Sequence, residues 1–146
     1  IGITVIAVDK FNVSKEYDDL EEKYKYDDLE ATLNFAKDIQ NLFVYTGESE
    51  DGRSMYKIEY NLPSSLNFEP NTNIFRKMSD NYMTDFKEKI DKLVSGLEEV
   101  KNETDEVEQC KLLNKIFGDD FPVPEKKNAA KKQMNYIPST SASGVK

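Results

Sequence analysis

The stretch SDNYMTDFKEKIDKLVSGLEEV, residues 79–100, decides the fold. Its apolar residues recur every three or four positions, which is the spacing of one face of an α-helix. They are Met83, Phe86, Ile90, Leu93, Val94, Leu97 and Val100. Ser79 can cap the start by accepting a backbone N–H bond, and Asp80 suits the positive end of the helix. This stretch predicts a long amphipathic helix in a mainly helical core.

Upstream of this helix, the sequence predicts another helix and a small β element. Asp27 or Asp28 can cap a helix whose apolar face is Leu29, Leu33, Ala36, Ile39 or Gln40, and Phe43. Glycines in TGESEDG, 46–52, break the helical pattern. MYKIEYNLP, 55–63, then alternates apolar and polar residues, which predicts a half-buried strand ended by Pro63. Part of 43–51 is a candidate to pair with this strand.

Two segments near the N-terminus are harder to assign. IGITVIAVDKF, 1–11, has the alternation and β-branching of a strand, but its other face is apolar too, so a buried helix is the alternative. SKEYDDLEEKYKYDD, 14–28, is dense in charge with interleaved tyrosines, which indicates a loop or a short exposed helix.

The C-terminal third predicts one more helix and then a tail. The helix starts at Asn102 or Thr104, and its inner side carries Val107, Cys110, Leu113 and Phe117. Gly118 ends this helix, Phe121 folds back onto the helix pair, and Pro122 and Pro124 prevent continuation. The pattern disappears from Glu125, so we expect a helical domain at 1–124 and a flexible basic tail at 125–146.

Charge and composition exclude several classes of function. The net charge is −8, the tail carries five lysines and one glutamate, and residues 1–124 therefore carry −12. Such an acidic body argues against broad nucleic-acid binding. One cysteine and no histidine exclude an internal disulfide, an ordinary zinc site, and serine–histidine or cysteine–histidine catalysis. No transmembrane or signal-peptide run occurs, so the expected location is the cytoplasm, without membrane contact.

The residues alone assign no catalytic, cofactor-binding or metal-binding side chain. The acidic pairs at 18–19, 27–28 and 119–120 are typical of caps and solvated turns. Arg53 follows a glycine in a segment typical of a surface turn, and Cys110 is predicted to fill the core. Three tyrosines are expected to pack on the core with solvated hydroxyls: Tyr17, Tyr24 and Tyr26.

Three segments, in their order along the chain, resemble a known family. They are YNLP at 60–63, NTNIFRKMSDNYMTDFKEKIDKL at 71–93 and LLNKIFGDDFPVP at 112–124. Together they resemble the C-terminal half of bacterial CD-NTases, the SMODS-type cyclic-oligonucleotide synthases related to cGAS and oligoadenylate synthase. The matching residues are Pro63, Asn73, Ile74, Phe75, Met78, Ser79, Phe86, Ile116, Phe117, Gly118, Phe121 and Pro122.

The resemblance implies a fold and a function. The fold is a helical, bundle-like domain with a small β element, like the C-terminal domain of oligoadenylate synthase, in which residues 1–11 are a buried helix. The parent enzyme joins nucleoside triphosphates with Mg²⁺ into cyclic second messengers in anti-phage defence. Its metal-binding acidic pair and Gly-Ser motif belong to an N-terminal core and do not occur in this sequence. We therefore expect the chain to be inactive alone and to form the wall of the nucleotide cleft through 1–11 and 12–28.

The resemblance also implies partners. The first is the N-terminal catalytic core of the same enzyme, and IGITVIAVDKF is the candidate for part of its docking face. The second is a ubiquitin-like conjugation enzyme acting on the tail at Gly144, although Val145 and Lys146 follow that glycine. The alternatives are a non-enzymatic acidic interaction module, whose tail binds or is attached to a partner, and a purely structural helical domain.

Overall fold

The computed structural model describes residues 2–61, 73–119 and 121–124 as four helices and two small antiparallel sheets. The elements follow in the order α1 (Gly2–Lys10), β1 (Lys15–Asp18), β2 (Lys23–Tyr26), α2 (Asp28–Gln40), β3 (Phe43–Glu48), β4 (Ser54–Ile58), α3 (Asp80–Asn102) and α4 (Glu106–Phe117). The expected mainly helical architecture with a small β element is present. The expected tail, 125–146, lies outside the described residues.

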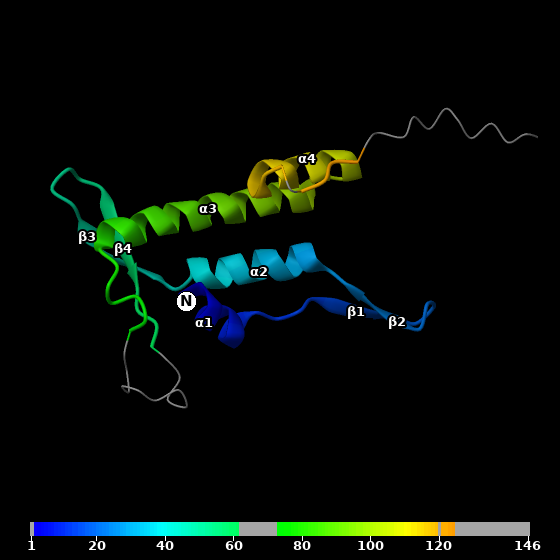
Figure 1. The fold of residues 1–146 in the computed structure, drawn as a ribbon, viewed down its shortest axis with the longest axis horizontal. Helices are drawn as coiled ribbons and strands as arrows, with labels where there is room; N and C mark the ends of the chain where they lie inside the picture. Colours follow the sequence, from blue (N-terminus) through cyan, green and yellow to red (C-terminus); the bar gives the residue numbers. More distant parts are fainter. Residues whose placement is uncertain (1, 62–72, 120, 125–146) are drawn as a thin grey trace, which may run out of the picture.

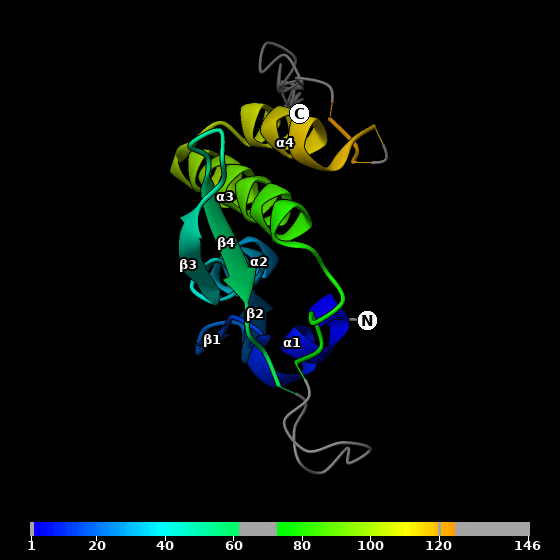
Figure 2. The same cartoon turned by 90° about the vertical axis from the view of Figure 1, so that its left-hand side faces the viewer.

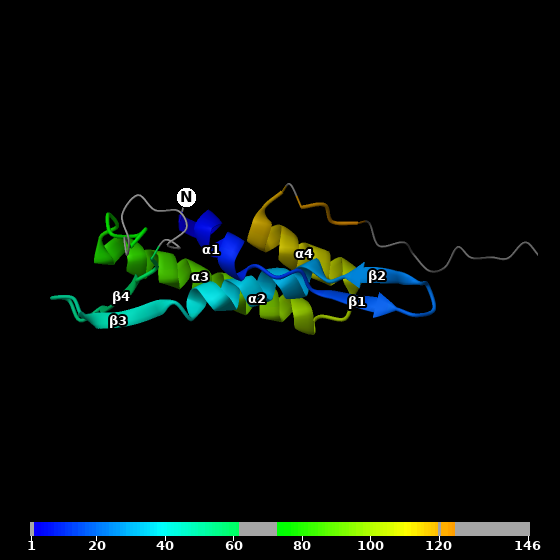
Figure 3. The same cartoon turned by 90° about the horizontal axis from the view of Figure 1, so that it is seen from below.

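The helices are stacked about α3, which is the longest (Figure 1). α2 lies along one side of α3 and α4 along the opposite side, and α1 lies beyond α2 (Figures 1 and 2). The two β-hairpins occupy opposite ends of this stack (Figure 3). α1 and α4 are therefore separated by the two central helices, so their outer surfaces are independent of each other.

The core forms where α2, α3 and β4 meet. Leu33 of α2, Leu97 of α3 and Ile58 of β4 are almost fully enclosed, together with Ile6 of α1. The stripe predicted for residues 79–100 is confirmed: Met83, Ile90, Val94, Leu97 and Val100 are buried, and Phe86 and Leu93 pack at its edge. Burial of these side chains supplies the main driving force for the fold.

The helix starts follow from local hydrogen bonds. Ser79 caps α3 by accepting the Tyr82 N–H, and Asp27 caps α2 by accepting the Glu30 N–H, both as predicted. The predicted start of the last helix at Asn102 or Thr104 was wrong. α3 continues through Asn102, and Asp105 caps α4 by accepting the N–H groups of its first turn.

The end of α4 agrees with the sequence in part. Gly118 stops it with a φ of 91°, in the region that favours glycine, and the Phe121 ring lies 6.5 Å from that of Phe117. The Asn114 amide fixes the fold-back by donating to the Gly118 and Phe121 carbonyls. On the inner side of α4, Leu113 packs on the core as predicted, but Ile116 packs there too and Phe117 is half exposed.

The sheets refine two expectations. β4 pairs with β3, so the predicted partner within 43–51 is confirmed, although the strand ends at Ile58 rather than at Pro63. Most of 14–28 is not the expected loop or short helix: residues 15–26 form the β1–β2 hairpin, with Tyr17 opposite Tyr24. The Asp18 carboxylate accepts the N–H groups of Leu20 and Glu21, which closes the turn.

The described part of the first segment forms the helix α1, as the resemblance implied, so the strand suggested by local alternation was wrong. Ile6 is the one residue of α1 classed as buried, so the expectation of a fully buried segment is also wrong for the part of the chain described. A helix that is apolar nearly all round is normally covered on all sides. α1 is covered on one side.

Candidate functional site

The outer side of α1 and the residues after it expose apolar side chains, which we call the α1 face: Ile3, Val8, Phe11 and Val13. Val8 is 86% exposed, Val13 55% and Ile3 48%. At 3.6 residues per turn, positions 2, 6 and 9 share the inner side of α1, whereas 3 and 8 lie away from it on its two flanks, about 140° apart. Aliphatic side chains of this exposure on a short helix mark a surface suited to contact with another polypeptide.

The inner side of α1 is fixed to the body by specific contacts. A Cβ added at Gly2 would lie 2.5 Å from Cε1 of Phe75, so only glycine allows this approach. The Tyr60 hydroxyl donates to the Asp9 carboxylate. Burial and this neighbouring carboxylate raise the pKa of Tyr60 to about 12, which keeps the hydroxyl protonated as a donor. These contacts hold α1 in an orientation that turns the α1 face outward.

The β1–β2 hairpin is a second exposed surface. The Tyr17 and Tyr24 rings meet edge to face at 5.2 Å, and the Lys15 ammonium lies 4.6 Å from the centre of the Tyr24 ring. Leu20 at the turn is 96% exposed. The prediction that these tyrosines pack on the core is wrong, because Tyr17, Tyr24 and Tyr26 all face solvent. Since the described residues pair β1 only with β2, both outer strand edges are free.

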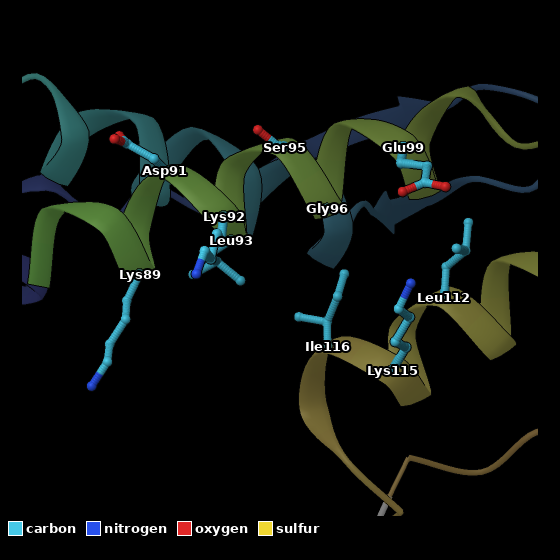
Figure 4. Close-up of a pocket in the computed structure, with 10 residues that line it drawn as sticks. All are labelled: Lys89, Asp91, Lys92, Leu93, Ser95, Gly96, Glu99, Leu112, Lys115 and Ile116. Atoms are coloured by element: carbon cyan, nitrogen blue, oxygen red, sulfur yellow. The ribbon is translucent and has the colours of Figure 1, made fainter. Parts of the chain in front are cut away.

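A groove of about 750 Å³ runs between α3 and α4 (Figure 4). We call it the α3–α4 groove. Its floor is apolar and consists of Leu93, Gly96, Leu112 and Ile116. Gly96 allows close approach of the helices, because an added Cβ would lie 3.0 Å from Cδ1 of Ile116.

Lysine side chains surround this apolar floor. Lys89 and Lys92 come from α3, and Lys115 points from α4 toward α3 (Figure 4). Within the described part of the chain, none of the three makes an ion pair with a carboxylate. Of the two acidic residues at the groove, Glu99 lies at the end near Lys115 and Asp91 points away toward α2.

Asp91 is committed to a structural contact. Its carboxylate accepts from the Gln40 amide at 2.9 Å and from the Lys87 ammonium at 2.6 Å. Burial acts to raise the pKa of Asp91, but these two donors outweigh it and hold the pKa below its ordinary value. The charge of Asp91 therefore does not compensate the lysines of the groove.

Across residues 2–61, 73–119 and 121–124 there is no group of three or more acidic or cysteine side chains that could hold a metal ion. Asp18 and Asp27 are occupied by the turn and the helix cap. The residues described do not fit the Mg²⁺ of a nucleotidyltransferase, and no catalytic step is assigned to them.

The remaining candidates have structural surroundings. Arg53 bridges Asp85 and Glu88 at 2.6 and 2.7 Å, so it pins the β3–β4 hairpin to α3. Cys110 is a free thiol, half buried on α4 rather than enclosed in the core. Gly144, the candidate for conjugation, lies outside the described residues.

Sequence reasoning missed the α3–α4 groove. Lys89 and Lys92 are three residues apart, so a shared side of α3 was foreseeable, but Lys115 joins them only once α4 packs against α3. Which lysines lack a carboxylate partner depends on this packing too.

No family model, no curated protein and no solved structure matches the chain. No helix in the described residues has the length and apolar character needed to cross a membrane.

Proposed function

We propose that this chain is the helical, non-catalytic part of a bacterial nucleotidyltransferase that makes cyclic oligonucleotide second messengers in anti-phage defence. In this proposal the catalytic core of the same enzyme holds Mg²⁺ and the nucleoside triphosphates, and the chain forms one wall of the cleft. The observation that carries the proposal is the α1 face, an outward apolar surface on a helix that is fixed from its inner side.

The residues that resemble the CD-NTase family have structural roles, which agrees with a non-catalytic part. Asn73 accepts the Tyr60 and Phe75 N–H groups and donates to the Ile58 carbonyl, so it ties the chain after β4 to the chain before α3. Ser79 caps α3 and Gly118 ends α4. These motif positions shape the fold and carry no reacting group. Such roles are expected of a part of the enzyme that lacks the catalytic residues.

The α1 face suits the core as its partner for a chemical reason. Its aliphatic side chains would leave water on contact with a complementary apolar surface, which stabilises an interface by about 25 cal/mol per Å² of apolar area. The β1–β2 hairpin is the next element after α1 and offers free strand edges of its own. Both surfaces belong to residues 1–28, the segment expected to line the cleft.

Surface variants of the complete enzyme test this proposal. Ile3→Ser with Val8→Ser should lower the yield of cyclic product at least about tenfold by weakening the core interface. Val44→Ser is the control, because Val44 is an exposed aliphatic residue on β3, outside the segment 1–28 that carries both proposed surfaces. Equal product from the paired variant, the control and the unmodified enzyme would refute the proposal.

The alternative, a non-enzymatic interaction module, is favoured by one different observation, the basic α3–α4 groove of an otherwise acidic chain. It predicts a partner-binding phenotype without any change in nucleotide products when the groove is altered.

A further inference from the structure

We propose that the α3–α4 groove binds an acidic peptide segment of another protein, with a leucine-like side chain as the apolar anchor. This site is distinct from the α1 face, because α1 and α4 lie on opposite sides of the helix stack (Figure 1). It therefore does not depend on the proposed enzyme function.

The first argument is charge. The chain carries −8, yet Lys89, Lys92 and Lys115 gather around one groove without a carboxylate partner in the described residues. In contrast, Lys37, Lys87 and Lys101 each pair with an acidic residue that secures the fold. Ammonium groups left unpaired around a groove favour an acidic ligand, and the acidic remainder of the body repels that ligand elsewhere.

The second argument is the apolar floor. Leu93, Leu112 and Ile116 are only partly covered by their own helices and line the space together. At Gly96 the Ile116 side chain lies directly against α3, so α4 approaches α3 closely beside the groove. An aliphatic anchor would contact the partly exposed leucine and isoleucine side chains of the floor, and its burial would add the apolar contribution that ion pairs on a surface lack.

The third argument distinguishes a peptide from a nucleotide. Among the described residues, the floor contains no aromatic ring on which a base could stack. The groove follows the middle of α3, where backbone N–H groups are already bonded within the helix. Lysine ammoniums bind carboxylates without demanding one orientation, which suits a peptide carrying several acidic residues. The lining is that of a helix groove that receives an amphipathic segment.

The test uses a synthetic peptide of alternating Glu-Glu and Leu-Leu pairs, titrated into the isotope-labelled chain and followed by amide chemical shifts. We expect shifts at α3 and α4 residues of the groove and none on the α1 face. Two further peptides separate the contributions: one replaces every glutamate with lysine, and the other replaces every leucine with serine. Both should bind at least about tenfold more weakly, and so should the original peptide at high salt.

Matched variants locate the site. The triple change Lys89→Gln, Lys92→Gln and Lys115→Gln should weaken binding at least about tenfold, and Leu112→Asn should weaken it several-fold. The control triple, Lys10→Gln, Lys15→Gln and Lys77→Gln, removes the same charge elsewhere and should change binding less than about twofold.

Three results would overturn the proposal: no binding of the acidic peptide by the folded chain, equal loss in both triple variants, or groove shifts with ATP but not with the peptide. Circular dichroism of each variant establishes that the helices are intact.

Discussion

The contact between Gly2 and Phe75 gives the sharpest test of how α1 is fixed. An alanine Cβ at position 2 would lie 2.5 and 2.7 Å from two carbons of the Phe75 ring, whereas carbon atoms pack at about 3.5–4.0 Å. The ring would have to move by about 1 Å. Phe75 is 7% exposed and belongs to the core cluster, so it has little room to yield.

We expect Gly2→Ala to destabilise the docking of α1 by about 1–2 kcal/mol. Overpacking a filled site costs about 1–3 kcal/mol. Alanine favours helix by about 1 kcal/mol over glycine in a helix interior, and Gly2 stands at the first residue of α1, where this gain is smaller. The steric cost therefore exceeds the gain in helix preference.

Hydrogen exchange of the α1 amides measures this effect, because the amides of a helix exchange faster when its docking to the core is weakened. Exchange should become about tenfold faster in Gly2→Ala, since about 1.4 kcal/mol corresponds to a factor of ten. In the Phe75→Leu background, where the ring is gone, the same substitution should be neutral or stabilising. If Gly2→Ala slows exchange equally in both backgrounds, the close contact with Phe75 is refuted.

Two further predictions concern polar contacts in the body. Thr84 is buried, and its hydroxyl accepts the Tyr56 N–H at 3.0 Å, so Thr84→Val should cost about 1–3 kcal/mol in urea unfolding by leaving that N–H unpaired. Thr84→Ser, which keeps the hydroxyl, should retain slow exchange of the Tyr56 amide, and fast exchange in both variants would contradict the contact. The pKa of Asp91 is lowered in the folded chain. The contribution of its carboxylate to the free energy of unfolding is therefore present above the ordinary pKa of 3.8 and is lost as the pH falls through the lower folded pKa. Asp91→Asn should lower the free energy of unfolding by at most about 1 kcal/mol near neutral pH, because the side chain is partly exposed to solvent. The variant should also lose less stability than the unmodified chain as the pH is lowered. Parallel curves of unfolding free energy against pH for the two proteins would rule this out.

The helices of the core could be predicted because local signals and packing agree. Ser79 and Asp27 stand immediately before apolar stripes of helical spacing, and the structure uses both as caps. The predicted start of α4 differs by one to three residues from the observed cap. Asn102 and Thr104 are residue types that often cap helices, but in the structure the Asp105 carboxylate accepts two N–H groups of the first turn.

Two other predictions, for residues 1–11 and 14–28, were wrong because these segments depend on contacts between residues distant in the sequence or on the geometry of one turn. IGITVIAVDKF alternates like a strand, but Gly2, Ile6 and Asp9 reach Phe75, the core and Tyr60 only from one side of a helix. The β1–β2 hairpin was hidden by charge density, and it depends on the turn closed by Asp18 and on a positive φ at Glu22. The α3–α4 groove could not be predicted, because its lysines belong to two helices whose packing the sequence does not specify locally.

The central claim is that this domain supports a nucleotide-joining reaction whose catalytic groups lie in other parts of the enzyme. The most direct measurement is mass spectrometry of the products formed from ATP, GTP, CTP and UTP with Mg²⁺, by this chain alone and by the chain together with the catalytic core that we propose for it. We predict no cyclic oligonucleotide from the chain alone and a cyclic product when the core is present. A cyclic product from the chain alone, or none when the core is present, would contradict the claim.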